Sequence, residues 1–154
     1  MKQLLRQYDA LETSKTKAMP KSKQQIDAFT RAYLECALWA ETDNSDDSGG
    51  DPLEDNYDLD DIDPESLKQA ITDCRRFQDE NAEDLARYSN KAWTADELGG
   101  HDFWLTRRGH GAGFWDRCDF LPKEARDRLT AAAKKCGERY VTVGDDGHVY
   151  IEKG

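Results

Sequence analysis

The sequence contains few apolar residues and no long apolar run. Hydrophobic residues make up 37% of the 154 residues, and charged residues make up 35%. No stretch approaches the roughly 18 consecutive apolar residues that indicate a membrane-spanning helix. The N-terminal stretch MKQLLRQYDALE also lacks the apolar core of a secretion signal. We therefore expect neither a membrane protein nor an exported one, and the 15 aromatic residues (four Trp, six Tyr and five Phe) argue against global disorder.

Closely spaced cysteine pairs are also missing. The four cysteines are far apart and form no CxxC motif: Cys36, Cys74, Cys118 and Cys136. Four cysteines in a secreted protein suggest two disulfides, but without an export signal we expect free, buried thiols in a reducing cytosol.

Basic residues are absent from one long stretch. Residues 41–63 contain no Lys or Arg but eleven acidic residues, whereas the whole chain has 32 acidic and 22 basic residues. Without those eleven, 21 acidic residues face 22 basic ones, so the net charge of −10 belongs to this segment. Such a concentration of negative charge repels itself unless a cation or a basic partner neutralises it. The pattern indicates a surface that presents acid to a partner.

The order of the remaining patterns predicts an α+β domain. Apolar residues at spacings of three and four predict helices over about 24–41, 64–89 and 122–136. Aromatic, glycine-rich and Asp-Gly signals predict two hairpins, over about 101–116 and 140–152, which form a small antiparallel sheet against the helices. We expect residues 24–154 to form a single domain with an acidic insert at 41–63, preceded by a basic arm or linker at 1–23.

One hypothesis for the acidic segment is a calcium loop. An EF-hand takes oxygen ligands at positions 1, 3, 5, 7, 9 and 12 of its loop. Aligned from Asp43, these positions are Asp43, Ser45, Asp47, the Gly49 carbonyl, Asp51 and Glu54. The backbone signals disagree, because Ser48 stands where the turn needs glycine and Gly50 stands where a branched apolar residue is usual. A specific calcium site is therefore a weak prediction, although loose cation binding fits any run this acidic.

A second hypothesis is mimicry of nucleic acid. Duplex DNA carries one negative charge about every 1.7 Å along its axis, and proteins bind it with Lys and Arg clefts. Leu53 and Tyr57 could anchor the segment, and its carboxylates could then occupy such a cleft. The alternative is a solvated loop that only aids solubility. The candidate contacting residues are Asp43, Asp46, Asp47, Asp51, Glu54, Asp55, Asp58, Asp60 and Asp61.

A third hypothesis is catalysis by the stretch HDFWLTRRGHGAGFWDR. Across the predicted hairpin, a His held by a carboxylate could act as general base, and Arg could hold a phosphate. The candidates are His101, Asp102, Arg107, His110 and Asp116. No Ser or Cys nucleophile stands at a recognisable elbow, and a zinc site at His101, His110 and Cys118 has unusual spacing. The alternative is that the aromatic residues of this stretch form core and its polar residues satisfy strand ends.

Two stretches, WAETDNSDDSGGDPLEDNY and HDFWLTRRGHGAGFWDR, together resemble a family of small hypothetical proteins encoded by bacteriophages and prophages. The resemblance runs from about residue 27 to 150 and leaves out the basic arm. It implies expression in the cytoplasm of an infected bacterium, and it implies no catalytic residue. Combined with the charge asymmetry, it favours a binding protein over an enzyme. The expected partner is a basic host protein or nucleoprotein complex, and we expect no direct nucleic-acid binding by the acidic face.

Overall fold

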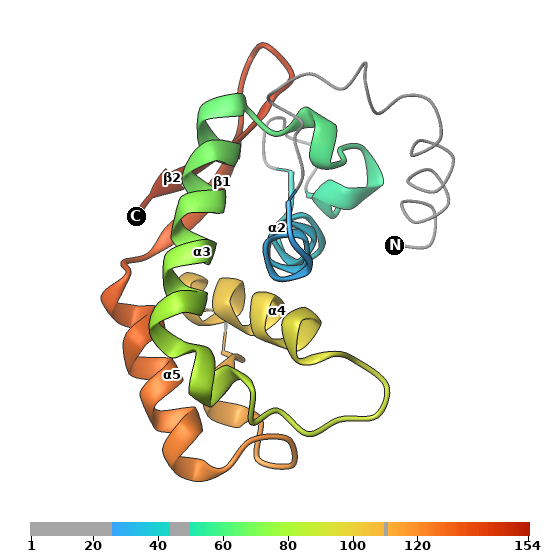
Figure 1. Ribbon diagram of the computed structural model, residues 1–154. Coiled ribbons are helices and arrows are strands. Elements are labelled where there is room, and N and C mark those ends of the chain that lie inside the picture. Colours follow the sequence, from blue (N-terminus) through green and yellow to red (C-terminus); the bar gives the residue numbers. More distant parts are fainter. Residues whose placement is uncertain (1–25, 44–49, 110) are drawn as a thin grey trace, which may run out of the picture.

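The computed structural model describes residues 26–43, 50–109 and 111–154. This part of the chain contains four α-helices and a two-stranded antiparallel sheet, which confirms the predicted α+β class (Figure 1). The elements are α2 (Ala28–Ala40), α3 (Pro64–Leu85), α4 (Ala95–Arg108), α5 (Lys123–Lys135), β1 (Arg139–Val143) and β2 (Val149–Lys153). The predicted basic arm at 1–23 lies outside the described residues.

Three of the helices lie close to their predicted positions, because each carries a local start or stop signal. The carboxylate of Asp27 caps the first turn of α2, and that of Asp63 caps α3 directly before Pro64. After α5 the chain turns at Gly137, where a φ of 95° suits a residue without a Cβ. These signals act over three or four residues, so they are readable without knowledge of the tertiary structure.

The predicted hairpin over residues 101–116 is wrong. Its first half, residues 101–108, lies in α4, and its last three residues form the short 3-10 helix η5 (Phe114–Asp116). A capping box starts α4: the Glu97 N–H donates to the Thr94 hydroxyl (3.0 Å), and the Thr94 N–H donates to the Glu97 carboxylate (2.9 Å). Gly109, with a φ of 76°, ends the helix. Only one hairpin is therefore present in the described residues.

Deep burial explains why the sequence of α4 lacks the pattern of a surface helix. Its buried residues are Gly99, Gly100, Asp102, Phe103, Trp104, Leu105, Thr106 and Arg107. A continuous buried stretch lacks the apolar-polar alternation of a surface helix and resembles a buried strand. Gly100 also has a packing role, since a Cβ there would lie 2.1 Å from the carbonyl oxygen of Phe29. The two glycines therefore permit α2 and α4 to approach closely.

The second predicted hairpin is confirmed. Strands β1 and β2 pair antiparallel with Val141 opposite Ile151, and the predicted Asp-Gly turn joins them. The N–H of Ile151 donates to the hydroxyl of Ser66 (3.0 Å) in the first turn of α3. Val149 forms a bridge to Ile62, at the end of the acidic segment. The hairpin therefore holds the start of α3 and the last acidic residues in place.

An aromatic cluster forms the centre of the core. The Phe77 ring of α3 stacks on Phe103 of α4, with 4.1 Å between ring centroids and 17° between ring planes. Phe29 of α2 and Phe114 of η5 pack against the same stack. These rings join four elements, and such aromatic pairs add about 0.5–1.5 kcal/mol each beyond burial. Phe103, Trp104 and Phe114 thus form core, as one of the sequence alternatives holds, whereas Trp115 of the same stretch is 45% exposed.

All four cysteines are free thiols. Cys36 and Cys74 are buried, as expected, whereas Cys118 and Cys136 are exposed. Burial raises the pKa of Cys36 and of Cys74, so both stay protonated in the core.

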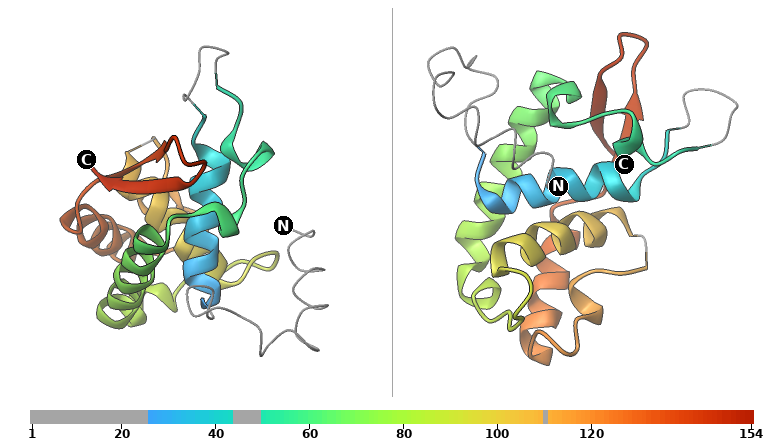
Figure 2. Two further views of the ribbon diagram at one scale, coloured as in Figure 1. Left: turned by 90° about the horizontal axis from the view of Figure 1, so that it is seen from above. Right: turned by 90° about the vertical axis from the view of Figure 1, so that its right-hand side faces the viewer.

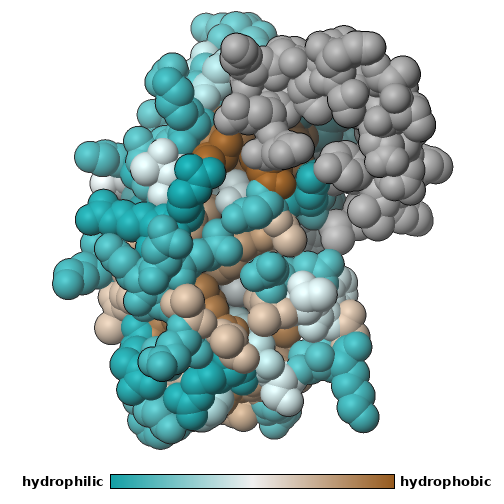
Figure 3. All heavy atoms as spheres, in the orientation of Figure 1, coloured by the Kyte–Doolittle hydropathy of each residue, from teal (hydrophilic) through white to brown (hydrophobic). Residues whose placement is uncertain are grey.

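The elements are arranged around the crossing of α2 and α4. Figures 1 and 2 show α3 along one side of the molecule, with α5 and the hairpin beside it, and α2 next to α4. Figure 3 shows a largely hydrophilic face with small apolar areas between the elements. Within the described ranges, no helix combines the length and apolar character needed to cross a membrane.

Candidate functional site

The acidic segment, residues 41–63, begins and ends on the body of the protein. Beyond α2, residues 41–43 pair with residues 51–53 in a short antiparallel stem. The Asp43 N–H donates to the Asp51 carbonyl (2.9 Å), and the Leu53 N–H donates to the Glu41 carbonyl (3.0 Å). Two short 3-10 helices then lead to α3: η3 (Leu53–Asp55) and η4 (Leu59–Asp61).

Apolar side chains hold the acidic segment against the body. Leu53 and Ile62 are almost fully buried, with exposed fractions of 1% and 5%, and Tyr57 and Leu59 are partly buried against the same core. Leu53 contributes as the predicted anchor, and Tyr57 assists it. Residues 50–63 therefore present their carboxylates from a fixed base.

The predicted contacting residues differ in exposure. Those that are exposed are Asp51, Glu54, Asp55, Asp58 and Asp60. Asp43 and Asp61 are half-buried, and Asp46 and Asp47 lie outside the described residues. In the described part of the chain, Asp51, Glu54 and Asp55 form no ion pair with a lysine or arginine. These three carboxylates are the clearest part of the acidic surface.

Glu41 differs from the rest of the segment, because it belongs to the core. Its carboxylate accepts from the Trp104 indole N–H (3.1 Å) and from the Arg108 guanidinium (3.2 Å), and its exposed fraction is 7%. A buried carboxylate needs such partners to offset its lost hydration. Glu41 therefore fastens the start of the acidic segment to α4.

Some carboxylates of the segment also stabilise its own backbone. Asp58 accepts from the N–H of Asp60 (2.9 Å), and Asp61 accepts from the N–H of Asp58 (2.9 Å). Asp63 caps α3 by accepting from the N–H of Ser66 (3.0 Å). Part of the negative charge thus has a structural use at turns and helix ends.

The calcium hypothesis is not tested by the structure. Ser45, Asp47 and Gly49 of the six proposed ligands lie outside the described residues. In the described ranges, no group of three His, Cys, Asp or Glu residues is close enough to hold a metal ion. The segment after the loop is a 3-10 turn, not the α-helix that follows an EF-hand loop.

Asp102, a candidate for catalysis, is instead the centre of a buried ion pair. It is fully buried. Its carboxylate accepts from two nitrogens of the Arg117 guanidinium, Nη2 (2.6 Å) and Nε (3.0 Å), and from the Tyr88 hydroxyl (2.5 Å). Burial raises the pKa of Tyr88 and the Asp102 carboxylate raises it further, so Tyr88 stays protonated as a donor. The network joins α4 to the chain on either side of it.

Arg107 takes part in a separate network. It is buried and donates to the carboxylate of Asp73 (2.8 Å), the hydroxyl of Tyr33 (3.2 Å) and the carbonyls of Cys136 and Gly137 (2.9 and 2.8 Å). Residues of an α-helix are separated by about 100° around its axis, so Arg107 and Asp102 point to well-separated directions. Arg107 joins α2, α3, α4 and the end of α5.

The remaining catalytic candidates lie apart from these two. His101 is half-buried against Trp39, with 5.5 Å between ring centroids. Asp116 accepts from the N–H of Gly113 (3.1 Å) within η5. His110 lies outside the described residues. The described candidates thus differ in their contacts, although His101 and Asp116 lie within electrostatic reach of the Asp102–Arg117 pair. These contacts do not support the enzyme or the zinc hypothesis.

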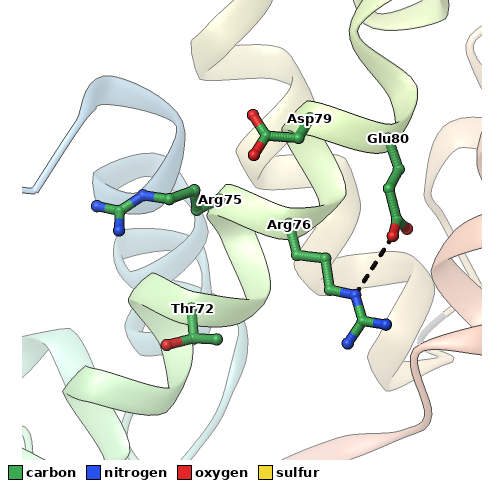
Figure 4. A pocket seen from close by; sticks show the side chains of 5 residues that line it. All are labelled: Thr72, Arg75, Arg76, Asp79 and Glu80. Carbon is green, nitrogen blue, oxygen red and sulfur yellow. Dashed lines mark hydrogen bonds and ion pairs between the residues drawn. The ribbon is translucent and has the colours of Figure 1, made fainter.

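A shallow hollow of about 340 Å³ lies elsewhere, along one face of α3 (Figure 4). Its lining residues are Thr72, Arg75, Arg76, Asp79 and Glu80. They all come from one helix, and Arg76 pairs with Glu80 across a single turn (3.3 Å). None of the predicted site residues lines it, and its polar groups do not converge on a common point in Figure 4.

The sequence patterns do not mark Trp39 as a surface residue. Trp39 belongs to the predicted helix over 24–41, and its side chain is 55% exposed. Arg31, Glu35 and Trp39 recur every four residues, which places them on one face of α2.

Comparisons with protein-family models, with curated proteins and with solved structures find no match to this chain.

Proposed function

We propose that this chain is a binding protein of the bacteriophage type, which acts in the cytoplasm of a bacterial host cell. Its acidic segment engages a basic cleft of a host nucleic-acid-handling or defence protein. The carboxylates occupy the positions that nucleic-acid phosphates take in that cleft, and the host protein is thereby inhibited or modulated. The resemblance to phage-encoded proteins underlies the choice of setting, and the charge asymmetry underlies the choice of partner.

One observation carries the proposal: exposed carboxylates stand on a segment that buried side chains hold in place. Asp51, Glu54 and Asp55 flank Leu53, which is 1% exposed. A surface that is already ordered loses less conformational entropy on binding than a free loop does. A loop that only aids solubility needs no such anchor.

The charge of the segment also matches the chemistry of a nucleic-acid cleft. Such clefts neutralise closely spaced phosphates with Lys and Arg, and their affinity falls steeply with salt. An acidic surface that enters the same cleft shows the same salt dependence, because the Debye length shrinks from about 8 Å at physiological ionic strength to about 3 Å at 1 M. The proposal therefore predicts competition between this protein and duplex DNA for one partner.

The test is capture from a bacterial lysate at low and at high salt, followed by elution with duplex DNA and mass spectrometry. A neutralised variant combines Asp51→Asn, Glu54→Gln and Asp55→Asn. A matched control removes the same three charges from exposed positions elsewhere: Asp79→Asn, Glu83→Gln and Asp119→Asn.

We expect a partner that binds at low salt, that DNA displaces, and that only the neutralised variant loses. A partner that both variants retain, or that DNA does not displace, contradicts the proposal. Loss of binding in both variants indicates an effect of net charge alone, which also contradicts a role for this particular surface.

A further inference from the structure

The exposed face of α2 carries a large aromatic side chain beside the acidic segment. Trp39 lies in the last turn of α2, two residues before the segment begins, and its side chain is 55% exposed. Its indole lies against the His101 ring of α4, with ring planes tilted by 37°. An exposed tryptophan that a neighbour holds in one orientation has the features of an interface anchor, since Trp is enriched among residues that dominate binding energy.

Glu35 lies on this face of α2, and two neighbouring elements each bring a carboxylate within electrostatic reach of it. Glu35 lies one turn before Trp39 on the same side of α2. Burial raises the pKa of Glu35, and the charges of Glu97 on α4 and Glu54 on η3 raise it further, whereas Arg31 lowers it. Glu35 therefore lies within electrostatic reach of both neighbouring elements. Figure 2 (right) shows α2 between α4 and residues 50–63, which agrees with this placement.

We propose that Trp39 receives an arginine side chain of the basic partner, with the indole face against the guanidinium and nearby carboxylates balancing its charge. This inference rests on the proposed function and adds the chemistry by which one partner residue is recognised. A planar guanidinium stacks on an aromatic ring and is hydrated more weakly than an ammonium, so arginine fits better than lysine.

The surroundings of Trp39 disfavour the other occupants of an exposed aromatic face. An apolar helix would desolvate Glu35 further without adding a cation to Arg31 of the same face, and a second copy would bring carboxylates of its own. A nucleic acid would bring its phosphates against the same carboxylates and be repelled. A cationic side chain is the occupant that gains from both the ring and the charges.

Arginine and lysine homopeptides of equal length provide the probe. Both carry the same charge, so the acidic segment alone attracts both, whereas the indole distinguishes their head groups. Binding of fluorescently labelled peptides is measured by anisotropy at physiological ionic strength. The variants are Trp39→Ala, the more conservative Trp39→Phe, and Trp93→Ala as a matched control, since Trp93 is 51% exposed on the loop before α4.

We expect the native protein to prefer the arginine peptide, and Trp39→Ala to weaken its binding by about two- to fivefold, the range of an exposed cation–π contact. Trp39→Ala should weaken binding of the lysine peptide less than that of the arginine peptide. The affinity of Trp39→Phe for the arginine peptide should lie between those of the native protein and Trp39→Ala, and Trp93→Ala should bind both peptides as the native protein does. Circular dichroism checks that each variant keeps its helices. An arginine preference that survives Trp39→Ala overturns the inference, because paired hydrogen bonds to carboxylates then explain it.

The same titrations separate this inference from the proposed function. If both peptides bind in a salt-dependent way that the neutralised acidic variant abolishes, but Trp39→Ala has no effect, the inference fails and the proposed function stands. If neither peptide binds, or if the neutralised acidic variant binds both as the native protein does, the acidic surface is not a cation-binding surface and both proposals fail.

Discussion

The buried pair of Asp102 and Arg117 allows a sharp prediction, because its two members differ in their access to water. The Asp102 side chain is fully buried, whereas the Arg117 side chain is 22% exposed. Arg117→Ala leaves a buried carboxylate that keeps the Tyr88 hydroxyl as its hydrogen-bond partner among the described residues. Asp102→Asn leaves a guanidinium that can still reach solvent, and the amide oxygen can still accept from Tyr88. The two substitutions should therefore have unequal costs.

The magnitudes follow from burial. Removing one member of a buried pair costs about 3–5 kcal/mol when the other charge is left without compensation. We expect Arg117→Ala to fall near the lower end, at about 3 kcal/mol, because the arginine is partly hydrated in the native pair. Asp102→Asn weakens charged hydrogen bonds but leaves no stranded anion, so we expect about 1–2 kcal/mol. For a chain of this size, about 3 kcal/mol lowers Tm by roughly 6–12 °C.

Urea unfolding followed by circular dichroism measures both values, and the double variant Asp102→Asn/Arg117→Ala completes a thermodynamic cycle. The double variant should be more stable than Arg117→Ala alone, since the stranded charge is gone. Two results would refute the role assigned to this pair. One is a free energy of unfolding for Arg117→Ala within about 1 kcal/mol of the native value, and the other is a larger loss of stability for Asp102→Asn than for Arg117→Ala.

Three further predictions concern α4 and its neighbours. Gly100→Ala forces a Cβ against the Phe29 carbonyl and should cost about 3 kcal/mol or more by thermal unfolding. Gly109→Ala, with open space but a φ of 76°, should cost only about 1–2 kcal/mol, and equal losses would contradict the packing role of Gly100. Leu53→Ala should lower the free energy of unfolding by about 2–5 kcal/mol, and no measurable loss would show that the acidic segment is not anchored there. Burial lowers the pKa of His101 below 6.5, although Asp102 opposes the shift. The unfolded chain then takes up the proton first, so stability should fall as pH drops below about 6.5. Between about pH 7 and pH 5, the thermal unfolding midpoint should decline less for His101→Gln than for the native protein. An equal decline in both proteins would show that His101 is not the group responsible.

Local signals explain the parts of the fold that were predicted. Asp63 before Pro64, Gly137 after α5 and the Asp-Gly turn of the last hairpin each act within a few residues, so they are visible in the sequence. The concentration of charge at 41–63 is also a property of the sequence alone. These features were sufficient for the α+β class and for the position of the acidic segment.

The prediction for residues 101–116 failed because burial removes the pattern on which it depended. A helix that is covered on most sides keeps no polar stripe, and its glycines are explained only by the neighbouring helix. The Thr94 and Glu97 capping box was a local signal that could have revealed α4. The aromatic residues of the stretch then supported either secondary structure equally well.

The sequence by itself determined where α2, α3 and α5 begin and end, how the last hairpin turns, and which segment holds the excess negative charge. The tertiary structure decided which charges face inward: Glu41, Asp102 and Arg107 have side-chain partners 14 to 74 positions away in the chain. It also left Trp39 exposed while burying Trp104. The physical reason is that composition and periodicity describe neighbours along the chain, whereas the desolvation of a charge or a ring depends on segments that only folding brings together.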